Sequence, residues 1–282
     1  MFGSFLTFFS TSLLMMSWCN TLKAQYYYKD LWNPQQLIKE MAILKHENIR
    51  TVSIKSFEDN GEPSQGFFCE KRIGKDYRMA QTVTRSNVTS QSLLTSHFNT
   101  KGLIITTTDS TVSSLNRTEY SYDKNDRIIE VKTFTKAEDD AGAIEESRNY
   151  AYNASGKLEK IVRKKNMTQL STVNFKVDEK GNVIEEEEIL TNGQGKKYFY
   201  YYDDNNRLTD VVNYNERANR LLPDYMYEYN DLGQITQMIA TEAGSSNYYI
   251  WRYTYNDRKL RETERCLSKE RRLLGSVEYH YN

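Results

Sequence analysis

Residues that commonly build metal and catalytic sites are scarce in this sequence. Its 282 residues include three histidines, three cysteines and three prolines. The histidines His46, His97 and His280 stand far apart, and no His-Glu-x-x-His spacing occurs. We therefore interpret each as a surface or half-buried side chain and predict no metal site.

Two motifs that would indicate chemistry are also missing. The sequence contains no Gly-x-Ser-x-Gly elbow, the motif typical of nucleophilic hydrolases. It also contains no Gly-x-x-x-x-Gly-Lys-Ser/Thr loop, the motif typical of nucleotide binding. We predict no enzyme activity, no catalytic residue and no cofactor. Lysine plus arginine and aspartate plus glutamate both number 38, and this balance argues against nucleic acid or an anionic membrane as partner.

The one long apolar run, Phe2 to Met16, is too short to span a bilayer. It is typical of a signal peptide, which we place at residues 1–24 with cleavage after Ala24 and Gln25 as the new N-terminus. The protein is therefore expected to be exported to the periplasm, to the outer surface or into the medium.

Two alternatives for this N-terminal segment stay open. Cys19 could carry a lipid, although the bulky Trp18 precedes it, or the segment could be retained as an anchor. Membrane contact is expected only if the segment is retained. After cleavage Cys69 and Cys266 remain, and they could form one long-range disulfide or two separate buried thiols.

Tyrosine is abundant, with 22 residues, and much of it lies in a pattern that returns about every 25 residues. The pattern is Tyr-x-Tyr-Asp/Asn-x-x-Gly-x-Leu/Ile. Its copies begin at Tyr120, Tyr150, Phe175, Tyr200, Tyr227 and Tyr253, with a degenerate first copy at Phe98-Asn99 and a truncated last one at Tyr279.

Each copy predicts a β-hairpin. The position three residues after the Asp or Asn tolerates positive φ, as a type I turn followed by a left-handed residue requires. These residues are Gly102, Asp126, Gly156, Gly181, Asn206 and Gly233. In that geometry Asp123 faces Arg127 and Tyr122 faces Ile128. The copy from Asn256 to Leu260 is one residue short and predicts a tighter turn with a local change of register.

The two tyrosines of each copy should point to the same face, because strand side chains alternate. Cross-strand aromatic pairs stabilise sheets, so we interpret the tyrosines as structural. An aromatic platform for sugars or peptides is the alternative.

On these residues the sequence resembles the YD-repeat, or Rhs-repeat, family, named for the Tyr-Asp that stands here as Tyr122-Asp123 and Tyr202-Asp203. The resemblance covers residues 97–282. It implies an exported or surface protein whose hairpins form a long spiralling sheet, which large members wrap around a toxin domain. With about seven hairpins and a last repeat ending at Asn282, this chain is expected to enclose no cargo and to carry no effector domain.

The expected fold is all-β: an elongated antiparallel meander of about seven or more stacked hairpins, a YD-repeat-like twisted sheet, with one N-terminal capping α-helix. Asn33 caps this helix, Pro34 lies in its first turn, and it ends near His46. We expect its apolar stripe to cover the first edge or one face of the sheet, and a partner-binding helix is the alternative. We propose the signal peptide at residues 1–24, the helical segment at 25–48, divergent hairpins at 49–96 and the repeat array at 97–282. Whether the sheet is open, curled or closed is left undecided.

Two further features bear on binding. Longer inter-hairpin loops are expected at residues 136–147, 191–197 and 215–224, gathered on one side as a variable binding surface. The acidic run from Glu185 to Glu188 should alternate between faces and is interpreted as a solvated strand edge rather than a calcium site.

The leading hypothesis is an exported, non-enzymatic scaffold that binds a protein or glycan of the envelope through its sheet face or its loops. One alternative is a glycan-active enzyme whose carboxylates come from distant repeats. Another is an accessory or immunity component of an Rhs-type toxin system.

Overall fold

The computed structural model describes residues 25–137, 143–215, 219–242 and 247–282. The predicted signal peptide and Cys19 lie outside this range. A π-helical segment, η1 (Tyr27–Trp32), runs directly into the helix α2 (Asn33–His46), and strands follow. These are β1 (Thr51–Glu58), β2 (Phe68–Ile73), β3 (Met79–Arg85), β4 (Ser92–Phe98), β5 (Ile104–Ser110), β6 (Ser114–Tyr122), β7 (Ile128–Ala137), β8 (Ile144–Tyr152), β9 (Leu158–Lys165), β10 (Thr168–Val177), β11 (Val183–Leu190), β12 (Gly195–Tyr202), β13 (Leu208–Asn215), β14 (Arg220–Tyr229), β15 (Ile235–Thr241), β16 (Tyr248–Tyr255), β17 (Arg261–Leu267) and β18 (Leu273–Tyr281).

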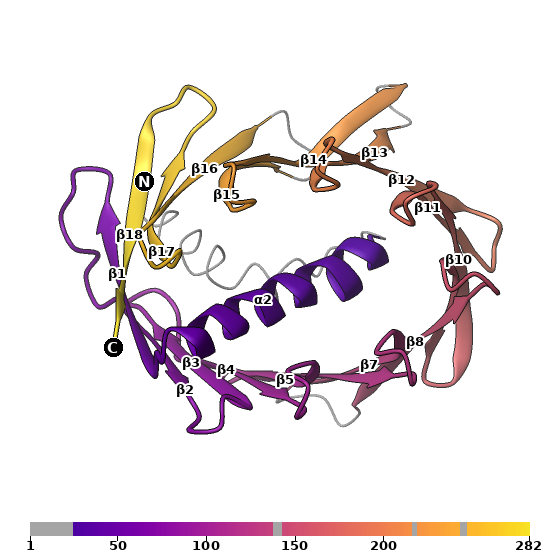
Figure 1. Cartoon of the computed structure of the whole chain (residues 1–282), viewed down its shortest axis with the longest axis horizontal. Coiled ribbons are helices and arrows are strands. Elements are labelled where there is room, and N and C mark those ends of the chain that lie inside the picture. Colours follow the sequence, from indigo (N-terminus) through magenta and orange to yellow (C-terminus); the bar gives the residue numbers. More distant parts are fainter. Residues whose placement is uncertain (1–24, 138–142, 216–218, 243–246) are drawn as a thin grey trace.

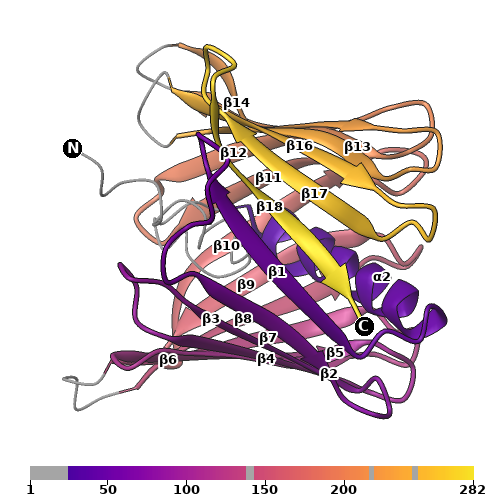
Figure 2. The same ribbon diagram turned by 90° about the vertical axis from the view of Figure 1, so that its left-hand side faces the viewer.

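The strands form one closed, 18-stranded antiparallel barrel. Each strand pairs with the next along the chain, and β1 also pairs with β18 from Val52↔Tyr281 to Glu58↔Gly275 (Figures 1 and 2). The expected elongated meander is therefore wrong. The repeats specify which neighbouring strands pair locally. Closure instead joins β18 to β1, more than 200 residues away in the sequence, and β1 carries no repeat motif. Closure removes both edges, which would otherwise expose unpaired main-chain groups.

The predicted hairpin turns are confirmed. Positive φ values occur at Asp126 (63°), Asn206 (65°) and the corresponding glycines. Asp123 accepts a hydrogen bond from the main-chain nitrogen of Arg127, and the two side chains form an ion pair at 2.6 Å. Tyr122 faces Ile128 as expected. The local sequence therefore determines each of these turns.

The turn at Asn256 does not follow the predicted change. The main-chain nitrogen of Asn256 donates to the oxygen of Leu260, and Lys259 takes the left-handed position with φ 61°. This turn has the same length as the others, and Tyr255 faces Arg261 just as Tyr122 faces Ile128. The prediction of a tighter turn is therefore wrong. Lys259 adopts the left-handed conformation at the position that elsewhere holds Gly, Asp or Asn, so no residue is missing from this turn.

The tyrosines of the repeats point into the barrel, as their shared face predicts. The second tyrosine of a copy donates its hydroxyl hydrogen to a main-chain oxygen of the preceding hairpin, close to the start of that hairpin's return strand. These bonds are Tyr122 to Ile104 (2.7 Å), Tyr152 to Ile128 (2.8 Å), Tyr202 to Val183 (2.9 Å), Tyr229 to Leu208 (2.6 Å), Tyr255 to Ile235 (2.8 Å) and Tyr281 to Arg261 (2.6 Å). The repeated tyrosine therefore links consecutive hairpins around the wall.

The helix α2 lies inside the ring of strands (Figure 1). Its predicted range is confirmed, but Trp32 rather than Asn33 precedes its first residue, and no side chain caps it. Of the two places proposed for this helix, the first edge of the sheet is wrong, because the closed sheet has no edge. The helix instead covers one face of the sheet, the inner one. No helix in the described ranges has the length and apolarity to cross a bilayer.

Candidate functional site

The interior of the barrel is filled by the segment from Gln25 to His46, which we call the plug. Its two ends pack against two separate cores. Near the C-terminal end of α2, Met41 and Leu44 join a cluster that includes Trp251 and Phe98. Near η1, Tyr26 and Tyr28 join another cluster that is rich in tyrosine from β8, β12 and β14. The plug therefore occupies the space in which a barrel of this size could hold a ligand.

The start of the plug is held by a single carboxylate of the wall. Glu186 on β11 accepts hydrogen bonds from the main-chain nitrogens of Gln25 (2.8 Å), Tyr26 (2.9 Å) and Tyr27 (3.0 Å). The hydroxyl of Tyr200 donates a fourth bond at 2.7 Å. Glu186 is completely buried, and this burial raises its pKa despite the four donors.

A second contact holds η1 one turn later. Asp30 accepts a 2.6 Å hydrogen bond from the Tyr150 hydroxyl, and Arg148 Nε forms an ion pair with the same carboxylate oxygen at 2.6 Å. Tyr28 and Tyr227 share a hydroxyl–hydroxyl hydrogen bond of 2.5 Å, and the Tyr28 ring stacks on Trp32. Buried polar groups of the wall therefore fix the register of the plug.

The acidic run alternates between faces as predicted, but its interpretation as a solvated edge is wrong for two of the four residues. Glu185 and Glu187 lie outside and pair with Lys197. Glu186 and Glu188 point inward and are buried, because the neighbouring strand completes an enclosed wall. The sequence contains one indication that two of these carboxylates point inward. Because side chains alternate along a strand, half of the carboxylates in an all-acidic strand must lie on each face of the sheet.

Glu188 belongs to a buried charge network beside the plug. It lies 2.5 Å from Arg163 Nη1 and accepts a 2.7 Å hydrogen bond from Ser171. Arg163 also pairs with Glu146 at 2.8 Å, and its guanidinium lies over the Tyr26 ring, 4.9 Å from the centroid. Burial raises the pKa of Glu146, but the two arginines beside it outweigh this effect, so the net shift is downward.

The two cysteines are both buried free thiols, on β2 and β17. Strands β1 and β18 separate them in the barrel. Three strand spacings amount to about 14 Å, well beyond the Cα separation of a disulfide. Of the two alternatives, separate thiols are therefore observed. Burial raises the pKa of Cys69 to about 11 and that of Cys266 to about 12, which disfavours the reactive thiolate.

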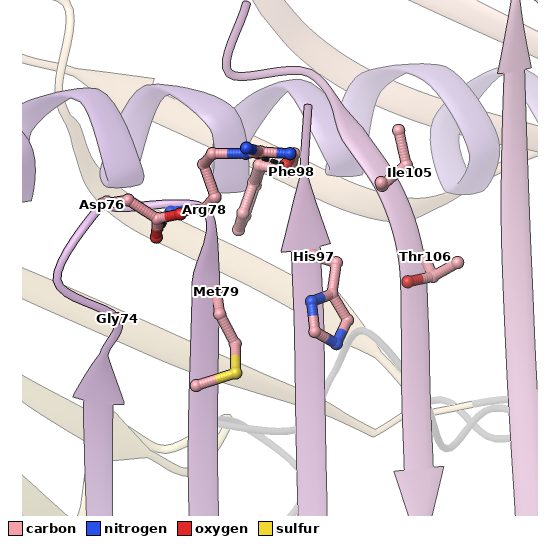
Figure 3. A pocket seen from close by; sticks show the side chains of 8 residues that line it. All are labelled: Gly74, Asp76, Arg78, Met79, His97, Phe98, Ile105 and Thr106. Carbon is pink, nitrogen blue, oxygen red and sulfur yellow. Dashed lines mark hydrogen bonds between the residues drawn. The ribbon is translucent and has the colours of Figure 1, made fainter. Parts of the chain in front are cut away.

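The histidines are all exposed and lie on different elements, so the prediction of scattered surface histidines is confirmed. His97 lines a shallow hollow of about 480 Å³ on β3–β5 (Figure 3). Met79, His97 and Thr106 lie side by side there on neighbouring strands, since both Met79 and Thr106 face His97 in the register. Across the four described ranges, no three His, Cys, Asp or Glu side chains gather as metal ligands.

The loops expected to bind a partner are shorter than predicted. β8 begins at Ile144, β12 at Gly195 and β14 at Arg220, so strands take up much of the three ranges. Residues 138–142 and 216–218 lie outside the described part of the chain. Because successive antiparallel strands alternate in direction, the described connection at residues 191–194 lies on the rim opposite the YD-like turns.

No family model matches the sequence, and no curated protein matches it either. Among solved structures the chain is similar to a chain of the TcdB2–TccC3 toxin complex, with TM-score 0.34 and 12% identity over 76% of this chain, which spans 12% of the toxin chain. It is also similar to porin-like proteins from Bacteroides uniformis (TM-score 0.38, 10% identity, covering 83% of this chain and 98% of that one) and Bacteroides vulgatus (TM-score 0.29, 13% identity, covering 83% and 98%). At these scores the similarities support no functional argument.

Proposed function

We propose that the chain is an exported, non-enzymatic β-barrel scaffold of the cell envelope or surface, a short relative of the YD-repeat proteins, which binds a protein partner on its outer face. The observation that supports this proposal is that the interior and the outer wall of the barrel differ in what is available for binding. The interior is occupied by the chain's own plug, so a partner has the outer wall and the rims available.

The outer wall carries an apolar surface on β12–β18, which we call the outer apolar row. In the register of β14–β18, Met226 faces Ile239, Ile239 faces Ile250, Ile250 faces Leu267 and Leu267 faces Leu273. These residues point outward because their neighbours Tyr227, Trp251 and Cys266 belong to the interior cores. On the adjoining strands the row continues with Phe199, Val212, Pro223, Tyr214 and Leu221.

Within the row Met226 is 38% exposed, whereas Ile250 (5%) and Val212 (8%) are covered. Contiguous apolar residues on an outer wall commonly mark protein interaction sites. Tyr214 is 45% exposed and Leu221 is 43% exposed, and they face each other across β13 and β14. Aromatic and branched aliphatic side chains on a rigid sheet lose little conformational entropy on binding. These properties favour a protein partner over a glycan.

The opposite part of the wall supports an aqueous setting. Lys160 on β9 and Lys176 on β10 are exposed. Lys197 on β12 forms ion pairs with Glu185 and Glu187 on β11, and Lys176 also pairs with Glu185. Strands that face lipid carry apolar side chains along their outward face. The proposed location in the envelope or outside the cell follows from this charged wall together with the apolar N-terminal run of the sequence.

The interior carboxylates do not favour the glycan-active alternative. Glu186 and Glu188 lie on β11 and Asp224 lies on β14, so two different hairpins contribute carboxylates, but each carboxylate accepts a hydrogen bond from the plug. A glycan could reach them only after the plug left the barrel. The accessory or immunity role stays a prediction from the family resemblance.

A site-specific photo-crosslinking experiment in the source cells tests the proposal. A photoreactive residue at Leu221 should crosslink an envelope protein. The matched control is Leu232, which is 67% exposed but lies on a YD-like turn at the rim. Loss of the crosslinked species in a Met226→Glu background would support the row as the interface. Equal crosslinking at both positions, none at either, or binding of an envelope glycan that Met226→Glu leaves unchanged would overturn the proposal.

A further inference from the structure

Glu186 is a fully buried carboxylate that lacks a cationic partner. The other three residues of the acidic run each pair with a lysine or arginine. Within the described ranges no lysine or arginine forms such a pair with Glu186, which instead accepts four neutral hydrogen bonds. A buried charge is costly to maintain without an opposite charge beside it. The site is therefore built for an anion but has no counterion among the described side chains.

The main-chain nitrogen closest to Glu186 is that of Gln25, 2.8 Å from Oε1. Gln25 is itself 1% exposed, and its φ is 109°. This value lies outside the regions that a residue with a side chain adopts without strain. The strain exists only while the nitrogen of Gln25 is bound to residue 24. A free terminal nitrogen can rotate without it.

We propose that the nitrogen of Gln25 is the α-ammonium group of the mature chain and that Glu186 is its buried counterion. The inference rests on the proposed export, because a signal peptidase would produce this terminus. Hydrolysis of the Ala24–Gln25 bond adds one water, leaves a carboxylate on Ala24, and leaves an amine on Gln25 that takes up a proton. Removal of the signal peptide then creates the positive charge that Glu186 lacks, so processing and anchoring of the plug are coupled.

The side chain of Gln25 adds a second consequence. A free N-terminal glutamine cyclises when its neutral amine attacks its own side-chain Cδ and releases ammonia. Here the side-chain amide donates to Asp224 on β14, while the main-chain nitrogen faces Glu186 on β11. A protonated, paired amine is not nucleophilic, and the amide is held by a different strand. The mature chain should therefore keep an open glutamine at its terminus.

Intact-mass analysis and amine labelling of the exported protein test the proposal directly. We expect a mass that corresponds to a chain starting at uncyclised Gln25. An amine-reactive acylating reagent should label this terminus only after denaturation, whereas exposed lysines such as Lys160 are labelled in both states. A different first residue, a loss of ammonia, or rapid labelling of the native terminus would overturn the inference. If the protein is not exported at all, the proposed function fails, and the same labelling can still be performed on a chain produced in vitro from Gln25.

A double-mutant cycle measures the coupling between the terminal amine of Gln25 and the carboxylate of Glu186. In the chain starting at Gln25, Glu186→Gln should shift the unfolding equilibrium constant by more than about 100-fold, in line with the loss of one partner from a buried ion pair. With Gly-Ser added before Gln25, the effect of Glu186→Gln should fall at least tenfold. Glu185→Gln, on the outer face, is the control and should have a small effect in both chains. Equal effects of Glu186→Gln in the two chains would overturn the proposal, and if the extended chain does not fold, the labelling result decides.

Discussion

The hydroxyl oxygen of Tyr229 lies 2.6 Å from the main-chain oxygen of Leu208, and the same bond recurs between other consecutive hairpins. Tyr229→Phe removes this donor and leaves a partly buried carbonyl without it. We expect the free energy of unfolding to fall by about 0.5–1.5 kcal/mol, measured by urea denaturation. Tyr201→Phe is the control, since Tyr201 points outward, and it should change stability by less than about 0.5 kcal/mol. Equal losses would mean that the tyrosine bond does not link the hairpins.

Arg163 is expected to be important for stability because it pairs with the buried carboxylate of Glu188 and the half-buried carboxylate of Glu146. Arg163→Met leaves Glu188 without a guanidinium and Glu146 with only the more distant Arg148, at 3.4 Å, and should cost about 3–5 kcal/mol. Adding Glu188→Gln should recover part of this loss. Lys197→Met, which breaks ion pairs on the outer face, should cost about 0–1 kcal/mol. Similar losses for Arg163→Met and Lys197→Met in thermal or chemical denaturation would contradict a buried network beside the plug.

Leu44 tests the packing of the plug. It is 1% exposed and packs in the core near Trp251, so Leu44→Ala should destabilise the protein by about 2–5 kcal/mol. The adjacent Lys45 is exposed, and Lys45→Ala should change stability by less than about 0.5 kcal/mol. If the two substitutions had the same small effect, α2 would not be packed inside the barrel.

The buried tyrosines predict alkaline unfolding. Burial raises the pKa values of Tyr150, Tyr227 and Tyr253 well above the ordinary 10.0 and that of Tyr152 to about 12. The unfolded chain loses these protons first as the pH rises. The contribution is therefore complete below pH 10 and is lost progressively as the pH rises towards the folded-state values. Urea midpoints should begin to fall near about pH 10 and continue to fall towards about pH 12, and tyrosinate absorbance should rise together with loss of the circular dichroism of the sheet. Complete ionisation with the sheet intact would contradict this.

The turns and the helix could be predicted from sequence because their causes are local. Positive φ at Asp126 and Asn206 follows from residue type, and the apolar spacing after Pro34 gives the range of α2. Strand alternation also gave the shared face of the tyrosines. Each of these features depends only on residues that are close together in the sequence.

Closure and the position of the plug could not be predicted in the same way. The pairing of β1 with β18 depends on the accumulated twist of the whole sheet, and β1 carries no repeat motif. Strand alternation predicts one aromatic and apolar face for each hairpin, but no local feature shows that this face is enclosed and that Glu186 and Glu188 are buried with it. Their burial depends on a plug that is about 160 residues distant in the chain.

The most direct test of the closed barrel is a disulfide across its seam. Lys55 and Glu278 are exposed and face each other across β1 and β18, at a separation that suits a disulfide. The pair Lys55→Cys and Glu278→Cys should form an intramolecular disulfide in the native exported protein under mild oxidation, detected by peptide mass mapping. The control pair Lys55→Cys and Lys160→Cys, on β1 and β9, should not. Absence of the seam disulfide in a natively folded monomer would contradict closure of the barrel.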